Sequence, residues 1–411
     1  MQWHRLRRQP EDEKRKNAVG FFCYGGRDPS YCTHPRAMAS IGADDTSLPS
    51  PAFCIDVDIV AANTRRMLAL ASAAGLALRP HVKTHKTLEG ALLSCGVADP
   101  ALARIVVSTL AEAEFFAARG VGDILYGLPL EPSKLARAAA LGARAGLAFS
   151  VMLDSSAGVA MLRAHALPGG APWRVFIAVD ATSYAREGAT PADAEALAAD
   201  VARGGGGVAL AGLYSHSGNS YSCADGAAGA ARVALLERDV MAALAARLRG
   251  AGVAVPAVSV GATPSASCGA GWEGVTELHP GNYVLYDRQQ VASGSCAAAD
   301  VACYVVARVV SVCAARGEAL VDAGATALHK DAAGLPDWGE LRGRPGVVVK
   351  RLTQELAVLG RADGAPLGLA LGDAVRILPN HACMTASGHF GRYHAVSGGK
   401  VVGTWTPCTG W

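Results

Sequence analysis

The strongest constraint on the fold is an alternation, between residues 53 and 286, of short apolar segments with longer segments rich in alanine, leucine and charged residues. The apolar segments predict buried strands, and the stretches between them predict helices. Strands that alternate with helices in this way are parallel and joined by crossover helices. The predicted strands are 53–57, 76–83, 104–108, 124–126, 149–153, 175–179, 209–214 and 257–260. About eight such units predict an α/β fold of the TIM type, a (β/α)8 barrel, rather than an open sheet.

The pattern changes after Tyr286, where strand-like segments follow one another without helices between them. These segments are 301–312, 319–322, 346–351, 355–359, 374–378 and a hairpin of 394–396 with 401–405. They predict a smaller all-β domain. We therefore expect three parts: a charged, disordered extension over 1–47, the barrel over 48–290 and the β domain over 291–411.

Composition excludes several classes of protein. The chain has 411 residues, too many for one ordinary core, and its 18% of charged residues is typical of a globular enzyme. A net charge of +3 offers no nucleic-acid footprint, and no apolar run approaches the ~20 residues needed to cross a membrane. Eleven cysteines without a C-x-x-C pair or a secretory signal predict reduced thiols and a cytoplasmic location.

The extension itself does not read as a transit peptide, because Glu11, Asp12 and Glu13 interrupt its basic residues. An organelle address nevertheless stays open. Met38, just before the periodic region, is an alternative start of the working chain.

The first candidate site is the segment from Arg79 to Thr87, which reads RPHVKTHKT and extends a predicted strand. On a strand, His81, Lys83 and His85 would share one face. Cationic neighbours and burial lower the pKa of a lysine, as a lysine that forms a Schiff base requires. A basic strand end on the surface explains this motif equally well when it is taken alone.

A second candidate lies near the other end of the chain, where Pro379 is followed by Asn380-His381-Ala382-Cys383. A strand here would bring His381 and Cys383 to one face, within reach of one metal ion. Imidazole and thiolate suit zinc or another borderline-soft divalent ion. Two protein ligands would leave positions for water or substrate. A buried cysteine beside a hydrogen-bonded histidine is the alternative without a metal.

Further candidates follow other predicted strands. Gly261-Ala262-Thr263 offers unhindered N–H groups and a hydroxyl, which a bound phosphate needs, although a plain loop would have the same sequence. Tyr214 ends a strand, with His216 and Tyr221 shortly after it. Tyr283 closes a His-Pro-Gly-Asn-Tyr turn, which could also be the connection between the domains.

From Pro51 to Trp411 the chain resembles the eukaryotic D-serine dehydratase and D-threonine aldolase family, which are pyridoxal-phosphate enzymes of the alanine-racemase fold (fold type III). The matching segments occur in the family's order: 79–87, 106–113, 123–126, 277–283 and 379–383. The resemblance implies that Lys83 carries pyridoxal 5'-phosphate and is catalytic together with His85. It further implies cofactor contacts from His81, Tyr214, Tyr221, Gly261, Ala262, Thr263 and Tyr283. By the same resemblance, His381 and Cys383 hold a divalent metal such as Zn, Mn, Co or Mg.

One loop departs from the family. Dehydratases of the family show Asp-x-Gly-x-x-Arg-x-Gly after the strand that here is 175–179, whereas this chain reads Asp180-Ala-Thr-Ser-Tyr-Ala-Arg-Glu-Gly188. The first glycine is lost, the spacing to Arg186 is longer by one residue, and Tyr184 is added. The remodelled loop favours carbon–carbon cleavage, whereas Cys383, where bacterial aldolases place Asp, favours dehydration.

We predict a D-threonine aldolase, which cleaves D-threonine and D-allo-threonine to glycine and acetaldehyde. The main alternative is a D-serine dehydratase, which forms pyruvate and ammonia. A non-catalytic pyridoxal-phosphate carrier is a remote alternative, because such carriers lack a β domain. The expected partner is a small D-amino acid, with no nucleic acid and no membrane, and the expected assembly is a homodimer.

Overall fold

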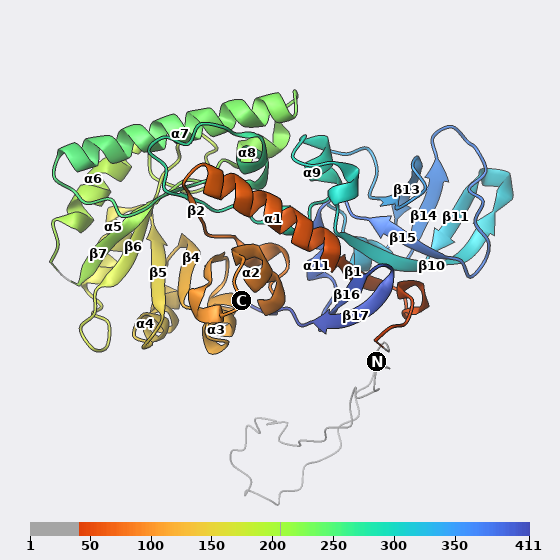
Figure 1. Ribbon diagram of the computed structural model, residues 1–411, viewed down its shortest axis with the longest axis horizontal. Coiled ribbons are helices and arrows are strands. Elements are labelled where there is room, and N and C mark those ends of the chain that lie inside the picture. Colours follow the sequence, from red (N-terminus) through yellow and green to blue (C-terminus); the bar gives the residue numbers. More distant parts are fainter. Residues whose placement is uncertain (1–40, 206) are drawn as a thin grey trace, which may run out of the picture. The chain divides into compact units, whose positions relative to one another are not determined.

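A computed structural model describes residues 41–205 and 207–411, and it contains the predicted barrel (Figure 1). Eight parallel strands lie in the order β2-β9-β8-β7-β6-β5-β4-β3. They are β2 (Ala77–Leu78), β3 (Arg104–Val107), β4 (Asp123–Pro129), β5 (Ala148–Leu153), β6 (Trp173–Ala178), β7 (Val208–Tyr214), β8 (Val258–Val260) and β9 (Glu277–Leu278). Beyond β2, the backbone of Pro80 and His81 pairs with Val106 of β3, with a 2.9 Å hydrogen bond from the Val106 N–H to the Pro80 carbonyl. This pairing closes the ring.

Helices cover the outside of this barrel. They are α1 (Val57–Ala73), α2 (Leu88–Cys95), α3 (Leu110–Ala118), α4 (Leu135–Gly142), α5 (Ser156–Arg163), α6 (Pro191–Ala202), α7 (Ala227–Gly250) and α8 (Thr263–Cys268). Several begin at a threonine or serine whose side chain accepts a backbone N–H of the first turn, as Thr87, Thr109 and Ser155 do.

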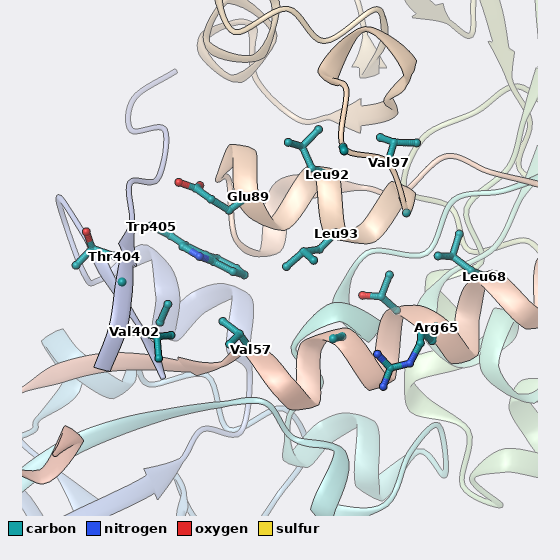
Figure 2. Close-up of a pocket in the computed structure, with 16 residues that line it drawn as sticks. Val57, Arg65, Leu68, Glu89, Leu92, Leu93, Val97, Val402, Thr404 and Trp405 are labelled. Atoms are coloured by element: carbon teal, nitrogen blue, oxygen red, sulfur yellow. The ribbon is translucent and has the colours of Figure 1, made fainter. Parts of the chain in front are cut away.

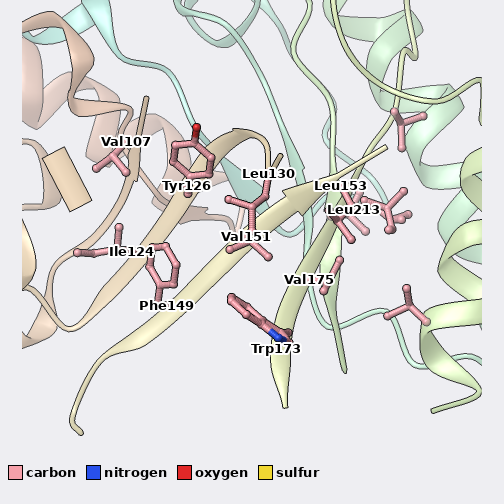
Figure 3. Packing of buried hydrophobic residues seen from close by; sticks show 14 of the residues in the cluster. Val107, Ile124, Tyr126, Leu130, Phe149, Val151, Leu153, Trp173, Val175 and Leu213 are labelled. Atoms are coloured by element: carbon pink, nitrogen blue, oxygen red, sulfur yellow. The ribbon is translucent and has the colours of Figure 1, made fainter. Parts of the chain in front are cut away.

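Successive residues of each strand point to opposite faces of the sheet, so the barrel has two cores. The outer one packs strand residues such as Ile124, Val151 and Trp173 against the helices (Figure 3). The inner one fills the barrel with side chains that include Val106, Phe176 and Tyr214.

The second sheet confirms the predicted β domain. Its strands β10 (Cys303–Cys313), β11 (Glu318–Val321), β14 (Ala357–Arg361), β13 (Val347–Leu352), β12 (Glu340–Leu341) and β15 (Ala374–Leu378) pair in that order, and β15 pairs with β10. They therefore form a closed antiparallel six-stranded ring. The predicted hairpin, β16 (Tyr393–Ser397) and β17 (Lys400–Trp405), joins the same sheet through β1 (Ala52–Asp56).

The strand predicted to open the barrel belongs instead to this second sheet. β1 (Ala52–Asp56) pairs antiparallel with β10 and parallel with β16. The short β9 takes the missing place in the barrel. Periodicity identifies a strand but not its partner, and two residues of β9 are too few to show a period. The predicted boundary at residue 290 falls within α9 (Arg288–Ala292) and stays a prediction.

The predicted disordered extension is wrong at its C-terminal end. Residues 1–40 lie outside the described part of the chain, but Asp45–Ser47 form a 3-10 helix. The buried Asp45 carboxylate accepts hydrogen bonds from the Tyr304 hydroxyl (2.5 Å) and from Arg376 Nε (2.7 Å). These contacts attach the segment to β10 and β15. In the described ranges, no helix has the length and apolar character that crossing a membrane would require.

A buried ion network lies where β2, β3, β4 and β9 meet. The Arg79 side chain is 2% exposed, and it binds Glu277 (Nε–Oε1 3.0 Å) and Asp123 (Nη1–Oδ1 2.7 Å). Arg104 pairs with the same two carboxylates, at 3.2 Å from Asp123 and 3.1 Å from Glu277. Asp123 and Glu277 begin β4 and β9, so the network holds together the strands on both sides of the closing seam.

A buried carboxyl group lies on the long helix α7. Glu237 is fully buried, near the hydroxyls of Ser215 and Ser217 and the backbone of Gly261. Burial raises the pKa of Glu237 to about 7, although these hydroxyls favour the ionised form. The folded protein therefore holds this proton to a higher pH than the unfolded chain does.

Replacing Arg79 by Met should destabilise the fold by about 3–5 kcal/mol, because it leaves Glu277 buried with one fewer cation. Urea unfolding followed by circular dichroism measures this loss. The same change at Arg232, whose pair with Asp225 is largely exposed, serves as the matched control and should cost little. Equal losses in both variants would contradict the assigned role of the network.

Replacing Glu237 by Gln should remove a pH dependence of stability. Because the pKa of Glu237 is raised in the folded state, its stabilising contribution is complete below about pH 4.5 and is lost as the pH rises through about 7. About 2.5 pH units at ~1.36 kcal/mol each correspond to a change on the order of 3 kcal/mol. The difference in unfolding free energy between wild type and Glu237→Gln should follow this curve between pH 4.5 and 8. A constant difference would refute the buried proton.

Candidate active site

A polar cavity of about 310 Å³ lies at the C-terminal ends of the barrel strands, where active sites of such barrels occur. Its lining comes from the loops after β2, β6, β7, β8 and β9 and from the start of α11 (Ala382–Ser387) in the β domain. The lining residues are His81, Lys83, Thr84, Tyr184, Arg186, His216, Gly218, Tyr221, Ser222, Ala262, Thr263, His279, Gly281, Asn282, Gln289, His381 and Cys383.

A larger cavity of about 710 Å³ lies between α1, α2 and β17 (Figure 2). Its lining is mainly apolar, as at Leu92, Leu93 and Trp405, with Arg65 and Glu89 among the few charged residues. It contains none of the candidate residues. We therefore place the chemistry in the smaller, polar cavity.

The segment that carries Lys83 is not the strand that the sequence predicts. β2 ends at Leu78, and Val82–Thr84 form a 3-10 helix, so His81, Lys83 and His85 do not share a strand face. Lys83 nevertheless lines the cavity. Burial lowers the pKa of Lys83, and the Arg186 guanidinium lowers it further, whereas Cys383 acts in the opposite direction. A neutral amine is the form that attacks a carbonyl carbon.

His81 and His85 have different surroundings. His81 Nδ1 accepts the Lys83 N–H (3.4 Å), and its Nε2 lies 3.3 Å from Ser108 Oγ, so the ring is fixed within the cavity wall. His85 is 1% exposed and does not line the cavity. Its Nδ1 contacts Thr87 Oγ1 (3.1 Å), and its ring packs against Gly90. The structure thus places His85 in the turn before α2, away from its predicted catalytic position.

His381 and Cys383 also lie outside any strand. β15 ends at Leu378, His381 precedes the first residue of α11, and Cys383 lies in its first turn. Both side chains still line the cavity that contains Lys83. Cys383 Sγ lies 3.2 Å from the Thr84 hydroxyl and 3.8 Å from Asn282 Nδ2 of the barrel loops.

Hydrogen bonds from the barrel side hold α11 in place. Asp287, fully buried, accepts the Ala382 N–H (2.8 Å) and the Asn282 amide (2.6 Å) through the same oxygen. The N–H groups of Arg288 and Gln289 donate to the carbonyls of Pro379 and Asn380. The position of His381 and Cys383 therefore depends on the segment that follows β9.

The surroundings of His381 and Cys383 fit a divalent metal. His381 Nδ1 lies 2.6 Å from Asp331 Oδ2, which leaves Nε2 as the free ligand atom, and metal-binding histidines are commonly oriented by such a carboxylate. Burial opposes ionisation of Cys383, but the neighbouring His381 lowers the pKa of the Cys383 thiol, which favours the thiolate. Across the described ranges, no cluster of three or more His, Cys, Asp or Glu side chains could hold a metal, so water or substrate would complete the coordination.

The cavity also fits a phosphorylated, aromatic cofactor. His279 Nε2 and Asn282 Oδ1 are buried without a partner in the described part of the chain, and both residues line the cavity. Such atoms are stabilised only when a ligand or water binds them. Gly281 fits against the His81 carbonyl, which a Cβ atom would approach to 2.6 Å. The predicted phosphate turn lies between β8 and α8, and Ala262 and Thr263 line the cavity beside Tyr221.

Two of the predicted tyrosines lie outside the cavity lining. Tyr214 belongs to the inner core of the barrel and stacks on His279 with 3.9 Å between ring centroids. It therefore supports the wall at His279. The Tyr283 hydroxyl donates to the Ser94 carbonyl (3.0 Å), so this side chain packs toward α2. Only its backbone N–H, which donates to Thr263 Oγ1 (3.3 Å), reaches the phosphate turn.

Several residues in the cavity wall, and Asp331 behind His381, were not predicted as site residues. His279 and Asn282 lie in the turn that contains Tyr283, and their position after a barrel strand was the signal that could have found them. Arg186 and Tyr184 lie in the remodelled loop. Asp331 has no local signal, because it lies 50 residues before its partner His381.

Burial favours the neutral form of three cavity histidines. Burial lowers the pKa of His81, of His216 and of His279, and Lys83 contributes to each shift. A neutral imidazole both donates and accepts hydrogen bonds. These histidines can therefore position a cofactor and a substrate through hydrogen bonds without repelling a positively charged group on either of them.

Two family models match consecutive parts of the chain. "Alanine racemase, N-terminal domain" matches residues 55–289, and "Putative serine dehydratase domain" matches residues 302–396. The chain is 37% identical over 382 residues to a D-threo-3-hydroxyaspartate dehydratase of Delftia sp. (strain HT23), covering 89% of this chain and 98% of the relative. A solved structure of that dehydratase superposes with a TM-score of 0.82, covering 89% of this chain and 99% of the other.

Relatives with two different activities match over most of the chain. A D-serine dehydratase of Schizosaccharomyces pombe is 33% identical, covering 90% of this chain and 94% of the relative. A D-threonine aldolase of Arthrobacter is 30% identical, covering 83% of this chain and 88% of the relative. This protein therefore belongs to the alanine-racemase-like, fold-type III family of pyridoxal-phosphate enzymes that includes D-serine dehydratases and D-threonine aldolases.

Proposed function

We propose that this protein is a pyridoxal-phosphate- and metal-dependent dehydratase of D-β-hydroxy amino acids, which converts D-serine to pyruvate and ammonia. The observation that carries the proposal is the convergence of Lys83 from the barrel with His381 and Cys383 from the β domain on one cavity. A D-threonine aldolase, which the sequence favoured, becomes the second candidate.

The relatives support dehydration over aldol cleavage. A 3-hydroxyaspartate dehydratase and D-serine dehydratases match about nine-tenths of the chain at 29–37% identity, whereas aldolases match at 28–30%. All of these relatives are lyases, and each matches this chain along nearly its whole length. This argues against the non-catalytic carrier. The remodelled loop from Asp180 to Gly188 is the feature that still favours the aldolase.

Solved variants of a D-threo-3-hydroxyaspartate dehydratase support the metal proposal. One has a histidine replaced by alanine, and another has a cysteine two positions later replaced by alanine and is described as metal-free. The same spacing separates His381 and Cys383. We propose that these two side chains hold one divalent ion here, which would act as a Lewis acid on the β-hydroxyl of the substrate.

The role of Lys83 follows from its surroundings. When bound, pyridoxal phosphate would supply the electron sink that makes the substrate Cα–H acidic. Because the lowered pKa of Lys83 favours the neutral amine, its Nζ can first hold the cofactor covalently and, once the substrate has displaced it, take the Cα proton. Thr263 and Tyr221 would hold the phosphate, and His279 and His216 would position the ring.

Fixed positions of Lys83 and of the proposed metal ligands would select one configuration at Cα, and the substrates named for the relatives indicate the D-configuration. Lys83 would approach Cα from the barrel, and the His381–Cys383 pair would approach the β-hydroxyl from the β domain. Only one configuration at Cα lets both contacts form at once. In the opposite enantiomer, either the Cα proton would point away from Lys83 or the β-hydroxyl would point away from the His381–Cys383 pair.

Product analysis tests the activity. With metal added, purified holoenzyme should release pyruvate and ammonia from D-serine at least about tenfold faster than glycine and acetaldehyde from D-threonine or D-allo-threonine. L-serine and L-threonine should not react. Lys83→Ala should lose activity by about a thousandfold or more, and borohydride should no longer fix the cofactor to the protein. Faster glycine release from D-threonine would decide for the aldolase.

Metal removal tests the role of His381 and Cys383. Chelation, or His381→Ala, should abolish turnover and metal content while the visible absorbance of the cofactor remains, because the metal pair is separate from Lys83. Asp331→Asn should weaken metal binding by about 10–100-fold. His165→Ala, an exposed histidine elsewhere, is the matched control. Full activity of metal-free enzyme would refute the metal proposal.

A further inference from the structure

The loop from Asp180 to Gly188, which departs from the family pattern, is held together at its base by two backbone hydrogen bonds. The Asp180 N–H donates to the Ala189 carbonyl (2.9 Å), and the Ala189 N–H donates to the Ala178 carbonyl (3.0 Å). These two bonds join the end of β6 to the segment that precedes α6. Residues between them therefore form a compact loop rather than a free connection.

Tyr184 is held in a defined position inside this loop. The Asp180 carboxylate accepts the N–H groups of Tyr184 (2.8 Å) and Ala185 (3.1 Å). Ser183 and Ala185, on either side of Tyr184, have φ angles of +54° and +56°. Residues with a Cβ atom adopt this left-handed conformation at an energetic cost, and such strain commonly occurs at functional sites.

The Tyr184 ring lies directly against the loop that follows β7. A methyl group at Gly218 would overlap the carbons of this ring, so the close packing requires glycine there. The His216 ring lies 6.3 Å from the Tyr184 ring, edge to face. Next to this contact, Thr182 and Asn219 exchange two hydrogen bonds of 3.2 and 3.3 Å. The two loops thus hold the aromatic ring between them.

The exposure of Tyr184 places it at the entrance of the cavity. Its side chain lines the cavity but is 38% exposed, whereas His81 and His279 are buried and His216 is half-buried. Arg186 is the other half-exposed residue of the loop that lines the cavity, and its guanidinium is paired with Glu187. A cavity of about 310 Å³ that also accepts a cofactor leaves little room for a substrate side chain.

We propose that Tyr184 is a specificity residue that limits the size of the substrate side chain at the cavity entrance. It favours D-serine over β-hydroxy amino acids with a larger group on Cβ. This inference rests on the proposed function, because it assumes that D-amino acids bind in this cavity. It assigns to the remodelled loop a role in substrate selection.

The test measures binding without turnover. D-alanine, D-2-aminobutyrate and D-valine have no β-hydroxyl, and their binding to holoenzyme can be followed by the visible absorbance of the cofactor. In wild type, Kd should rise by at least about tenfold from D-alanine to D-valine. Tyr184→Ala and Tyr184→Ser should remove most of this rise, whereas Tyr184→Phe, which keeps the ring, should retain it.

Gly218→Ala provides an independent test, because its methyl group displaces the Tyr184 ring. Gly218→Ala should change the size preference when Tyr184 is present, but it should have no further effect when Tyr184 is already replaced by Ala. A double-mutant cycle of the two substitutions measures this difference. An equal effect in both backgrounds would show that Gly218 acts without Tyr184.

The outcomes separate this inference from the proposed function. If the size dependence is the same in wild type, Tyr184→Ala and Tyr184→Ser, the inference is wrong, whatever products D-serine gives. If wild type shows no size dependence, it is also wrong. If D-threonine is cleaved to glycine but Tyr184→Ala abolishes the size dependence of Kd, the proposed dehydration fails and the role of Tyr184 stands.

Discussion

The rest of the structure depends on the seam at which the barrel closes. Pro80 and His81 continue β2 just far enough to pair with β3, and the buried Arg79 binds carboxylates that begin β4 and β9. A guanidinium so deeply buried is tolerated only because its charge is paired and its donors are bonded. The 3-10 turn that carries Lys83 begins immediately after this seam. Closing the barrel and positioning the candidate catalytic lysine are therefore achieved by the same few residues.

The candidate metal ligands depend on a second structural element, the segment after β9. Asn282 and Asp287 connect the phosphate side of the barrel to the first turn of α11. His381 and Cys383 thereby face Lys83 although about 300 residues of chain separate them. Fixed geometry of this kind between the proposed base and the proposed metal ligands is what a stereospecific reaction requires. It also explains why the β domain is part of the site and not an appendage.

Burial sets the charge state of the site. It lowers the pKa of Lys83 and of three cavity histidines, whereas the neighbouring His381 lowers the pKa of the Cys383 thiol. The cavity can therefore hold an anionic cofactor and an uncharged amine together. The remodelled loop lies at the entrance to this arrangement, where a change in sequence can alter substrate selection without disturbing the lysine or the metal ligands.

The sequence alone determined the two kinds of sheet, because strand and helix periods are local properties of the chain. Its motifs also predicted Lys83, His381 and Cys383 as site residues, and the structure brings these three to one cavity. The sequence could not assign β1 to the second sheet or find β9, because strand pairing is a long-range choice. It also wrongly extended strands through His85 and Cys383, since polar ends of strands and short turns have the same local pattern. Only the tertiary structure separated His85, Tyr214 and Tyr283 from the cavity, brought in His279 and Tyr184, and placed Asp331 beside His381. Which side chains face a cavity is decided by packing between segments that are distant in the chain.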